Sequence, residues 1–186
     1  MQSDHLIVMT GGPGSGKTTL IDALEAAGFA RTHEAGRGII QDQAAIGGLA
    51  LPWHDPLAFA EQTLAWDMRS YRMAQARDRT VFCDRGIPDT IGYLRLMKLP
   101  VPAHMEKAAE LFRYSPRVFI APPWRNIFAQ DAERRQDFAE AERTYQAMAE
   151  TYTGLGYELV ALPLVSVADR MRFVMGELGA TTASIS

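Results

Sequence analysis

Two kinds of hydrophobic pattern alternate along this chain. Short and almost wholly apolar runs are separated by longer segments in which apolar residues recur every three or four positions. The short runs predict buried strands, and the longer segments predict amphipathic helices. The predicted strands cover residues 5–10, 29–33, 80–84, 117–121 and 157–162.

The predicted helices lie between these strands and after the last one. Glycine and proline mark several of their ends, with Gly28 after the first helix and Pro56 in the first turn of a long one. The helices cover 17–27, a segment ending at Ile46, a long segment from Pro56, 87–97, a segment reaching about Tyr114, a segment from Phe138 to Gly154, and a last helix after Ser166.

Strands that alternate with helices predict right-handed crossovers and a parallel sheet covered on both faces. We therefore predict an α/β fold of three layers around a five-stranded parallel sheet. A chain of 186 residues suits one domain, which we place at residues 1–179. The small and polar residues 180–186 are predicted to form a disordered tail.

Composition and charge exclude several classes of protein. A formal net charge of −3 argues against broad nucleic-acid binding, which usually needs a strongly basic face. The single cysteine, Cys83, rules out an internal disulfide and a multi-cysteine metal site, and it suits a reducing compartment. No apolar run approaches the roughly 20 residues of a transmembrane helix, and the N-terminus lacks the layout of a signal peptide. We expect a cytoplasmic protein.

A glycine-rich segment, GGPGSGKTT at 11–19, joins the first predicted strand to the first predicted helix with the spacing G-x-x-x-x-G-K-[ST]. Its glycines leave backbone N–H groups open to a polyphosphate, Lys17 would reach the outer phosphates, and the Thr18 hydroxyl would bind Mg²⁺. A turn without a ligand is disfavoured, because the required strand and helix flank it. We predict binding of ATP, with GTP as the alternative, by Gly12, Pro13, Gly14, Ser15, Gly16, Lys17, Thr18 and Thr19.

Charged residues follow the ends of other predicted strands, where ligands of parallel sheets bind. Asp84 is predicted to bind Mg²⁺ together with Thr18, or else to cap the next helix. Arg85 would contact a phosphate, or else form a structural salt bridge. Glu34 would be the general base or would orient the acceptor, or else it would only favour the dipole of the following helix. The roles of Glu34 and Asp84 are interchangeable at this point.

The polar segment 124–136 lies between the fourth predicted strand and a long helix. We predict a lid here, in which Arg125, Arg134 and Arg135 neutralise charge on a transferring phosphoryl group. The alternative is a solvated helix start with ion pairs. Residues 162–166 are candidates for contact with adenine. Candidates for lining an acceptor pocket are Arg37, Trp53, His54, Asp55 and Asp89.

Five segments of the chain resemble a family of small P-loop proteins described as AAA-type ATPases, which is similar to the kinase domain of bifunctional nicotinamide-riboside kinases. The segments are GGPGSGKTT, HEAGRGII, FCDRGIPDTIGYL, APPWRNIF and DAERRQDF. The likeness extends from about His5 to Gly179. It implies a nucleoside- or nucleotide-kinase-like P-loop fold, Mg²⁺, and phosphates on residues 12–19. The pair Asp84-Arg85 also resembles that of thymidylate-kinase-like enzymes.

The function favoured by these features is a small-molecule kinase that transfers the γ-phosphate of ATP to a nucleoside-like or other small metabolite. One alternative is a nucleotide-dependent ATPase or GTPase switch, although the guanine signature N-K-x-D does not occur in the chain. Another is a module that binds an anionic ligand such as a lipid, as some members of the resembled family do. The sequence leaves the acceptor and the oligomeric state open.

Overall fold

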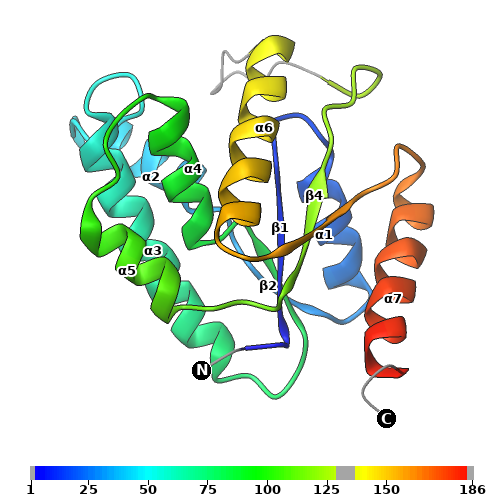
Figure 1. Cartoon of the computed structure of the whole chain (residues 1–186). Helices are drawn as coiled ribbons and strands as arrows, with labels where there is room; N and C mark the ends of the chain where they lie inside the picture. Colours follow the sequence, from blue (N-terminus) through cyan, green and yellow to red (C-terminus); the bar gives the residue numbers. More distant parts are fainter. Residues whose placement is uncertain (1–2, 129–136, 184–186) are drawn as a thin grey trace.

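Five parallel strands form one sheet, and the first strand of the chain lies at its centre (Figure 1). The computed structural model describes residues 3–128 and 137–183. The strands follow the order β2-β3-β1-β4-β5, which confirms the predicted five-stranded parallel sheet. Their bounds are β1 (Leu6–Gly11), β2 (Ala30–Thr32), β3 (Val81–Asp84), β4 (Arg117–Ala121) and β5 (Glu158–Ala161).

Helices cover both faces of the sheet, as predicted. In Figure 1, α3, α4 and α5 lie to the left of β1, whereas α1 and α7 lie to its right. None of the helices in the described part of the chain has the length and apolar character needed to cross a bilayer. The helices are α1 (Lys17–Ala26), α2 (Ala35–Ile46), α3 (Pro56–Gln75), α4 (Ile87–Leu96), α5 (Ala103–Leu111), α6 (Phe138–Gly154) and α7 (Val167–Ala183), the last of which continues beyond the predicted domain end at 179.

The central strand supplies side chains to two separate cores. Leu6 and Val8 pack toward α3, α4, α5 and α6, whereas Ile7 and Met9 pack toward α1 and α7. Successive side chains of a strand point to opposite faces, so a strand covered on both sides must be apolar throughout. The edge strand β5 departs from this pattern, because its end residues Glu158 and Ala161 are exposed.

The end of α5 differs from the prediction. The helix ends at Leu111 rather than near Tyr114, because the chain turns there and carries Tyr114 into the core. The Tyr114 hydroxyl accepts a hydrogen bond from the backbone N–H of Ile87 at the start of α4. A tertiary contact therefore overrides the helical pattern of these residues.

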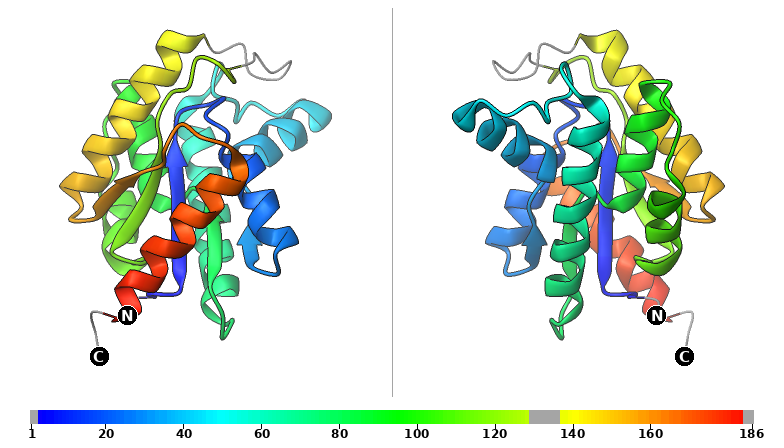
Figure 2. Two further views of the ribbon diagram at one scale, coloured as in Figure 1. Left: turned by 90° about the vertical axis from the view of Figure 1, so that its right-hand side faces the viewer. Right: turned by 90° about the vertical axis from the view of Figure 1, so that its left-hand side faces the viewer.

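Helix α2 projects from the body of the molecule, as Figure 2 shows. It is attached through a small third core, in which Ala35 and Ile39 pack against Phe59 of α3. The loop after α2 ends at Asp55, whose side chain accepts a hydrogen bond from the N–H of Ala58 and so caps α3. This arrangement leaves a space bounded by α2, α3, α4 and α6.

Candidate active site

The glycine-rich loop follows β1 and packs against neighbouring backbone. Gly11 has a φ of +125°, and a Cβ atom on it would lie 2.4 Å from the carbonyl oxygen of Ala121 in β4. A Cβ atom on Gly12 would lie 2.4 Å from the carbonyl oxygen of Ala141 in α6. These two glycines therefore allow the loop to approach β4 and α6, besides leaving its N–H groups accessible.

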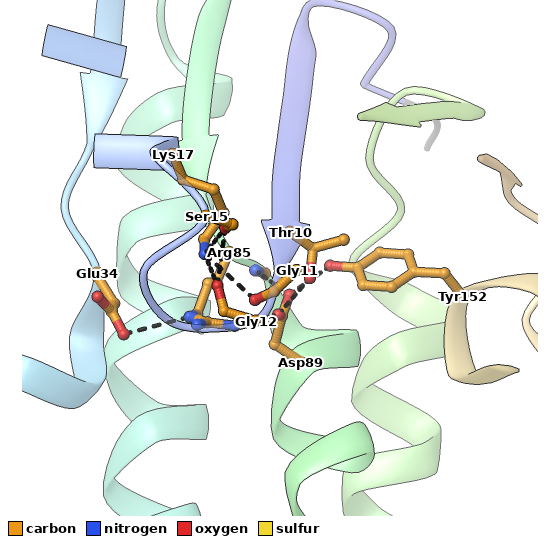
Figure 3. A network of polar contacts seen from close by, with 10 residues as sticks. Thr10, Gly11, Gly12, Ser15, Lys17, Glu34, Arg85, Asp89 and Tyr152 are labelled. Atoms are coloured by element: carbon orange, nitrogen blue, oxygen red, sulfur yellow. Dashed lines mark hydrogen bonds and ion pairs between the residues drawn. The ribbon is translucent and has the colours of Figure 1, made fainter. Parts of the chain in front are cut away.

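The side chain of Lys17 lies inside this loop (Figure 3). Its Nζ atom donates to the carbonyl oxygens of Gly12 at 2.6 Å and Gly11 at 3.2 Å, and to the hydroxyl of Ser15 at 3.2 Å. Burial and the nearby charge of Arg85 lower the pKa of Lys17 to about 7. Oxygens of a bound phosphate would replace these carbonyl partners and favour the charged amine.

Of the two predicted ligands for Mg²⁺, Thr18 lines the cavity at the glycine-rich loop, whereas Asp84 lies at the end of β3. Asp84 ends β3 and is 3% exposed, and its Oδ1 atom has no hydrogen-bond partner among the described residues. Burial, and after it the charge of Glu34, raises the pKa of Asp84. No group of three or more side chains that could hold a metal ion occurs in the described ranges.

Arg85 is held between two carboxylates. Its backbone φ is +72°, which is rare for a residue with a Cβ atom. The guanidinium donates from Nε to Oε1 of Glu34 at 3.2 Å and from Nη1 to Oδ1 of Asp89 at 3.0 Å. Although burial alone lowers the pKa of Arg85, the charges of Glu34 and Asp89 raise it overall. The salt bridge anticipated as an alternative for Arg85 therefore forms, and it joins the residue after β3 to the start of α2 and to α4.

Asp89 is the hub of this network (Figure 3). Besides Arg85, its carboxylate accepts from the hydroxyls of Thr10 and Tyr152, each at 2.6 Å, and from the backbone N–H of Gly86 at 3.0 Å. These four donors satisfy the hydrogen-bonding capacity of a buried carboxylate. The hydrophobic pattern of α6 indicates only a core role for Tyr152, so its contact with Asp89 has no signal in the sequence.

Two cavities open on either side of Glu34. The first, called the loop cavity here, has a volume of about 530 Å³. The second, called the large cavity, has a volume of about 950 Å³. Glu34 and Pro13 line both. The loop cavity is otherwise lined by residues 14–19, Arg37, Trp124, Ile127, Phe128, Val165, Ser166, Val167 and Arg170.

Arg170 also lines the loop cavity. It is 1% exposed, and its guanidinium lies over the ring of Trp124 at 4.8 Å and donates to the backbone carbonyls of Ser15 at 2.9 Å and Pro163 at 2.8 Å. The flat surface of Trp124 and the apolar Val165 suit a nucleobase. The predicted adenine segment thus contributes Val165 and Ser166, whereas Arg170 was not predicted, because it follows this segment inside α7.

The large cavity lies between four helices, α2, α3, α4 and α6, that each supply side chains to its wall. Asp67 of α3 is 6% exposed and makes no hydrogen bond to another described residue. Burial, and after it the charge of Asp89, raises its pKa well above the usual range. The helical residues that line the cavity include Ala35, Gly36 and Ile40 of α2, Phe59, Thr63 and Asp67 of α3, Asp89, Thr90, Tyr93 and Leu96 of α4, and Glu140, Thr144 and Met148 of α6.

The other candidates from the sequence divide between the cavities and the surface. Trp53 and Asp89 line the large cavity, and Arg37 lines the loop cavity. His54 and Asp55 line neither. Arg125 is exposed and lines neither, and its guanidinium lies over the ring of Phe138 at 4.0 Å. Arg134 and Arg135 lie outside the described residues, so the predicted lid stays a prediction.

Comparison with known families agrees with this architecture. A family model described as an AAA domain matches residues 6–170. The chain belongs to this family. No curated protein is significantly similar in sequence.

Solved structures of kinases share the fold of this AAA-domain protein. Deoxyadenosine kinase from M. mycoides, with dCMP and dCDP bound, has a TM-score of 0.70 at 12% identity, covering 94% of this chain and 99% of the kinase. Thymidylate kinase from Ehrlichia chaffeensis has a TM-score of 0.63 at 18% identity, covering 95% and 99%. The NadR protein in complex with NR has a TM-score of 0.67 at 17% identity, covering 94% of this chain and 49% of NadR. These likenesses confirm the predicted kinase-like P-loop fold.

Proposed function

We propose that this protein is a Mg²⁺-dependent kinase that transfers the γ-phosphate of ATP to a hydroxyl group of a small molecule. The observation that carries the proposal is the place of Glu34, which lines both cavities. The general base takes the proton of the attacking hydroxyl group while the phosphoryl group is transferred. It must therefore lie where the ATP site meets the site of the molecule that receives the phosphate. A hydrolase or a switch needs only water there and gives no reason for a second cavity of about 950 Å³.

The loop cavity would hold the donor. Backbone N–H groups of residues 12–19 and the amine of Lys17 would bind the phosphates, and the N-terminus of α1 would face them. Thr18 and Asp84 would hold Mg²⁺. A bound Mg²⁺ ion would neutralise part of the negative charge of the phosphates. Arg170 and Trp124 would pack against the base, and their contacts suit adenine without excluding guanine.

Glu34 and Arg85 would act on the acceptor side. The carboxylate of Glu34 would take the proton of the attacking hydroxyl, while the oxygen forms its bond to the γ-phosphorus and ADP leaves. Arg85 would orient Glu34 through their 3.2 Å contact and would face the transferring phosphoryl group. As residues of a lid, Arg125, Arg134 and Arg135 would neutralise negative charge on the transferring phosphoryl group. Phosphoryl transfer depends mostly on positioning and electrostatics, so such cations matter by about 10³-fold or more.

The test is ADP formation from Mg·ATP with and without a mixture of purified small-molecule metabolites, followed by mass spectrometry of phosphorylated products. We expect the mixture to accelerate ADP formation at least tenfold. Glu34→Gln should abolish product formation and leave the Kd for ATP within about twofold. The control is Glu106→Gln, because Glu106 is an exposed carboxylate on α5 that lines neither cavity. ADP formation at one rate with and without the mixture would instead indicate a hydrolase.

A further inference from the structure

Among the described residues, the wall of the large cavity carries more acidic than basic side chains. Carboxylates of Glu34, Asp67, Asp89 and Glu140 line it, and Arg85 is the one basic side chain that does so among the described residues. The guanidinium of Arg85 already donates to Glu34 and Asp89. A phosphate group on an incoming molecule would therefore have to compete with Glu34 and Asp89 for Arg85.

Several buried polar groups on the same wall have no partner in the described part of the chain. They are the Oγ1 atoms of Thr90 and Thr144 and the hydroxyl of Tyr93, while the carboxyl of Asp67 likewise makes no hydrogen bond to a described residue. Thr90, Thr144 and Asp67 are 2%, 6% and 6% exposed. Buried polar groups are usually hydrogen-bonded, and leaving them without partners costs free energy. These groups belong to residues of α3, α4 and α6 that line the large cavity.

Apolar surface lies beside these polar groups. The rings of Phe59 and Tyr93 pack edge to face with their centroids 5.4 Å apart, and Trp53 lines the cavity from the loop before α3. Cavities of 300–1,000 Å³ with mostly apolar walls and a few polar groups are typical of small-molecule sites. The large cavity, at about 950 Å³, lies in this range and accommodates a flat ring together with its polar substituents.

We propose that the large cavity selects an acceptor without a phosphate group, namely a neutral or cationic molecule of nucleoside size, whose amino or hydroxyl groups donate hydrogen bonds to Asp67. The proposal rests on the function proposed above and narrows its acceptor to a nucleoside rather than a nucleotide. Thr90 and Thr144 supply further hydrogen bonds, and the rings of Phe59, Tyr93 and Trp53 pack against the apolar part of the acceptor. Asp67 is a specificity-determining residue, and the reacting hydroxyl lies toward Glu34.

The test is calorimetry with the full chain saturated with ADP and Mg²⁺. The probes are adenosine, guanosine, cytidine, uridine, thymidine and the cationic 1-methyladenosine, each paired with its own 5′-monophosphate. We expect at least one nucleoside to bind tenfold or more tightly than its monophosphate. Tighter binding of the monophosphates would overturn the proposal, and so would a lack of binding by every nucleoside to a protein that binds ADP normally.

The decisive variant is Asp67→Asn, which keeps the size of the side chain and replaces one oxygen of the carboxyl group by an NH₂ group that can only donate hydrogen bonds. We expect the Kd of the preferred nucleoside to rise at least tenfold, the Kd of ADP to change less than twofold, and the preference over the monophosphate to shrink. Glu61→Gln on the exposed side of the same helix is the control and should change neither constant. Thr90→Val is a second isosteric change in the cavity, and it should also weaken nucleoside binding. It provides the same test if Asp67→Asn does not fold.

Unchanged nucleoside affinity in the folded variants of Asp67 and Thr90 would overturn the role given to these residues. The two proposals fail differently. A protein that binds no nucleotide, or in which Glu34→Gln transfers phosphate normally, contradicts the proposed kinase. A working kinase that prefers phosphorylated acceptors contradicts only the acceptor class.

Discussion

Replacing Asp67 by asparagine should stabilise the protein at neutral pH. The Asp67 carboxyl is 6% exposed, makes no hydrogen bond to a described residue, and lies near the carboxylate of Asp89. Burial and that neighbouring charge raise its pKa well above the usual range, so ionising it costs more in the folded chain than in the unfolded one. An asparagine has nearly the same shape and cannot ionise.

The size of the gain follows from the surroundings of Asp67. A buried polar group without a partner costs about 1–3 kcal/mol, and the amide of asparagine keeps part of that cost. Because Asp67 lines a large cavity that water can enter, we expect a gain near the lower end, about 1 kcal/mol at pH 7. For a chain of this size, such a gain raises Tm by about 2–4 °C.

The gain should depend on pH in a defined direction. The unfolded Asp67 loses its proton near its ordinary pKa of about 3.9, whereas the folded one keeps its proton to higher pH. Stability of the wild type therefore falls as pH rises through the interval between these two pKa values, and Asp67→Asn does not share this fall. Urea unfolding of both proteins from pH 3.5 to pH 8 measures the difference. A gain that is constant with pH, or a loss that grows toward pH 8, would refute the reasoning.

Other substitutions test other parts of the site. Asp89→Asn removes a buried carboxylate that accepts from four donors, including Arg85. Urea denaturation should therefore show a free energy of unfolding lower by about 3 kcal/mol. A change below about 0.5 kcal/mol would contradict the role of Asp89 as a hub. Gly12→Ala places a Cβ atom 2.4 Å from a backbone oxygen of α6. Thermal melts should therefore show a lower Tm, and titrations should show weaker binding of Mg·ATP. The control is Gly176→Ala, whose Cβ atom meets nothing within 4 Å, and its effect on stability should be neutral or favourable.

The strands and the phosphate loop were predictable because local sequence determines them. Every observed strand bound lies within one residue of its predicted bound, since the apolar runs mark strands that are covered on both faces. The loop motif GGPGSGKTT fixes the place of Lys17 and Thr18 relative to β1 and α1. The convergence of Glu34 and Arg85 also followed from the rule that the carboxyl ends of parallel strands share one edge.

The rest of the site depends on tertiary contacts that leave no local signal. Asp67 shares the buried face of α3 with Leu64 and Tyr71, but the sequence does not show that a cavity opens beside it. The left-handed backbone at Arg85 and the end of α5 before Tyr114 arise from contacts with distant residues. From the sequence, Arg85 is only a candidate phosphate contact, and Asp67 and Tyr114 are only parts of predicted helices.

The central claim is that a nucleoside triphosphate binds at the loop after β1, with Lys17 and Mg²⁺ on its phosphates. Calorimetric titration of Mg·ATP into the wild type and into Lys17→Ala tests it most directly. We expect one site per chain in the wild type and a loss of at least tenfold in affinity in the variant, with about 2.7 kcal/mol of added stability at a ligand concentration of about 100 times the Kd. No measurable heat with ATP or GTP in the presence of Mg²⁺, or equal affinity in the variant, would contradict the account.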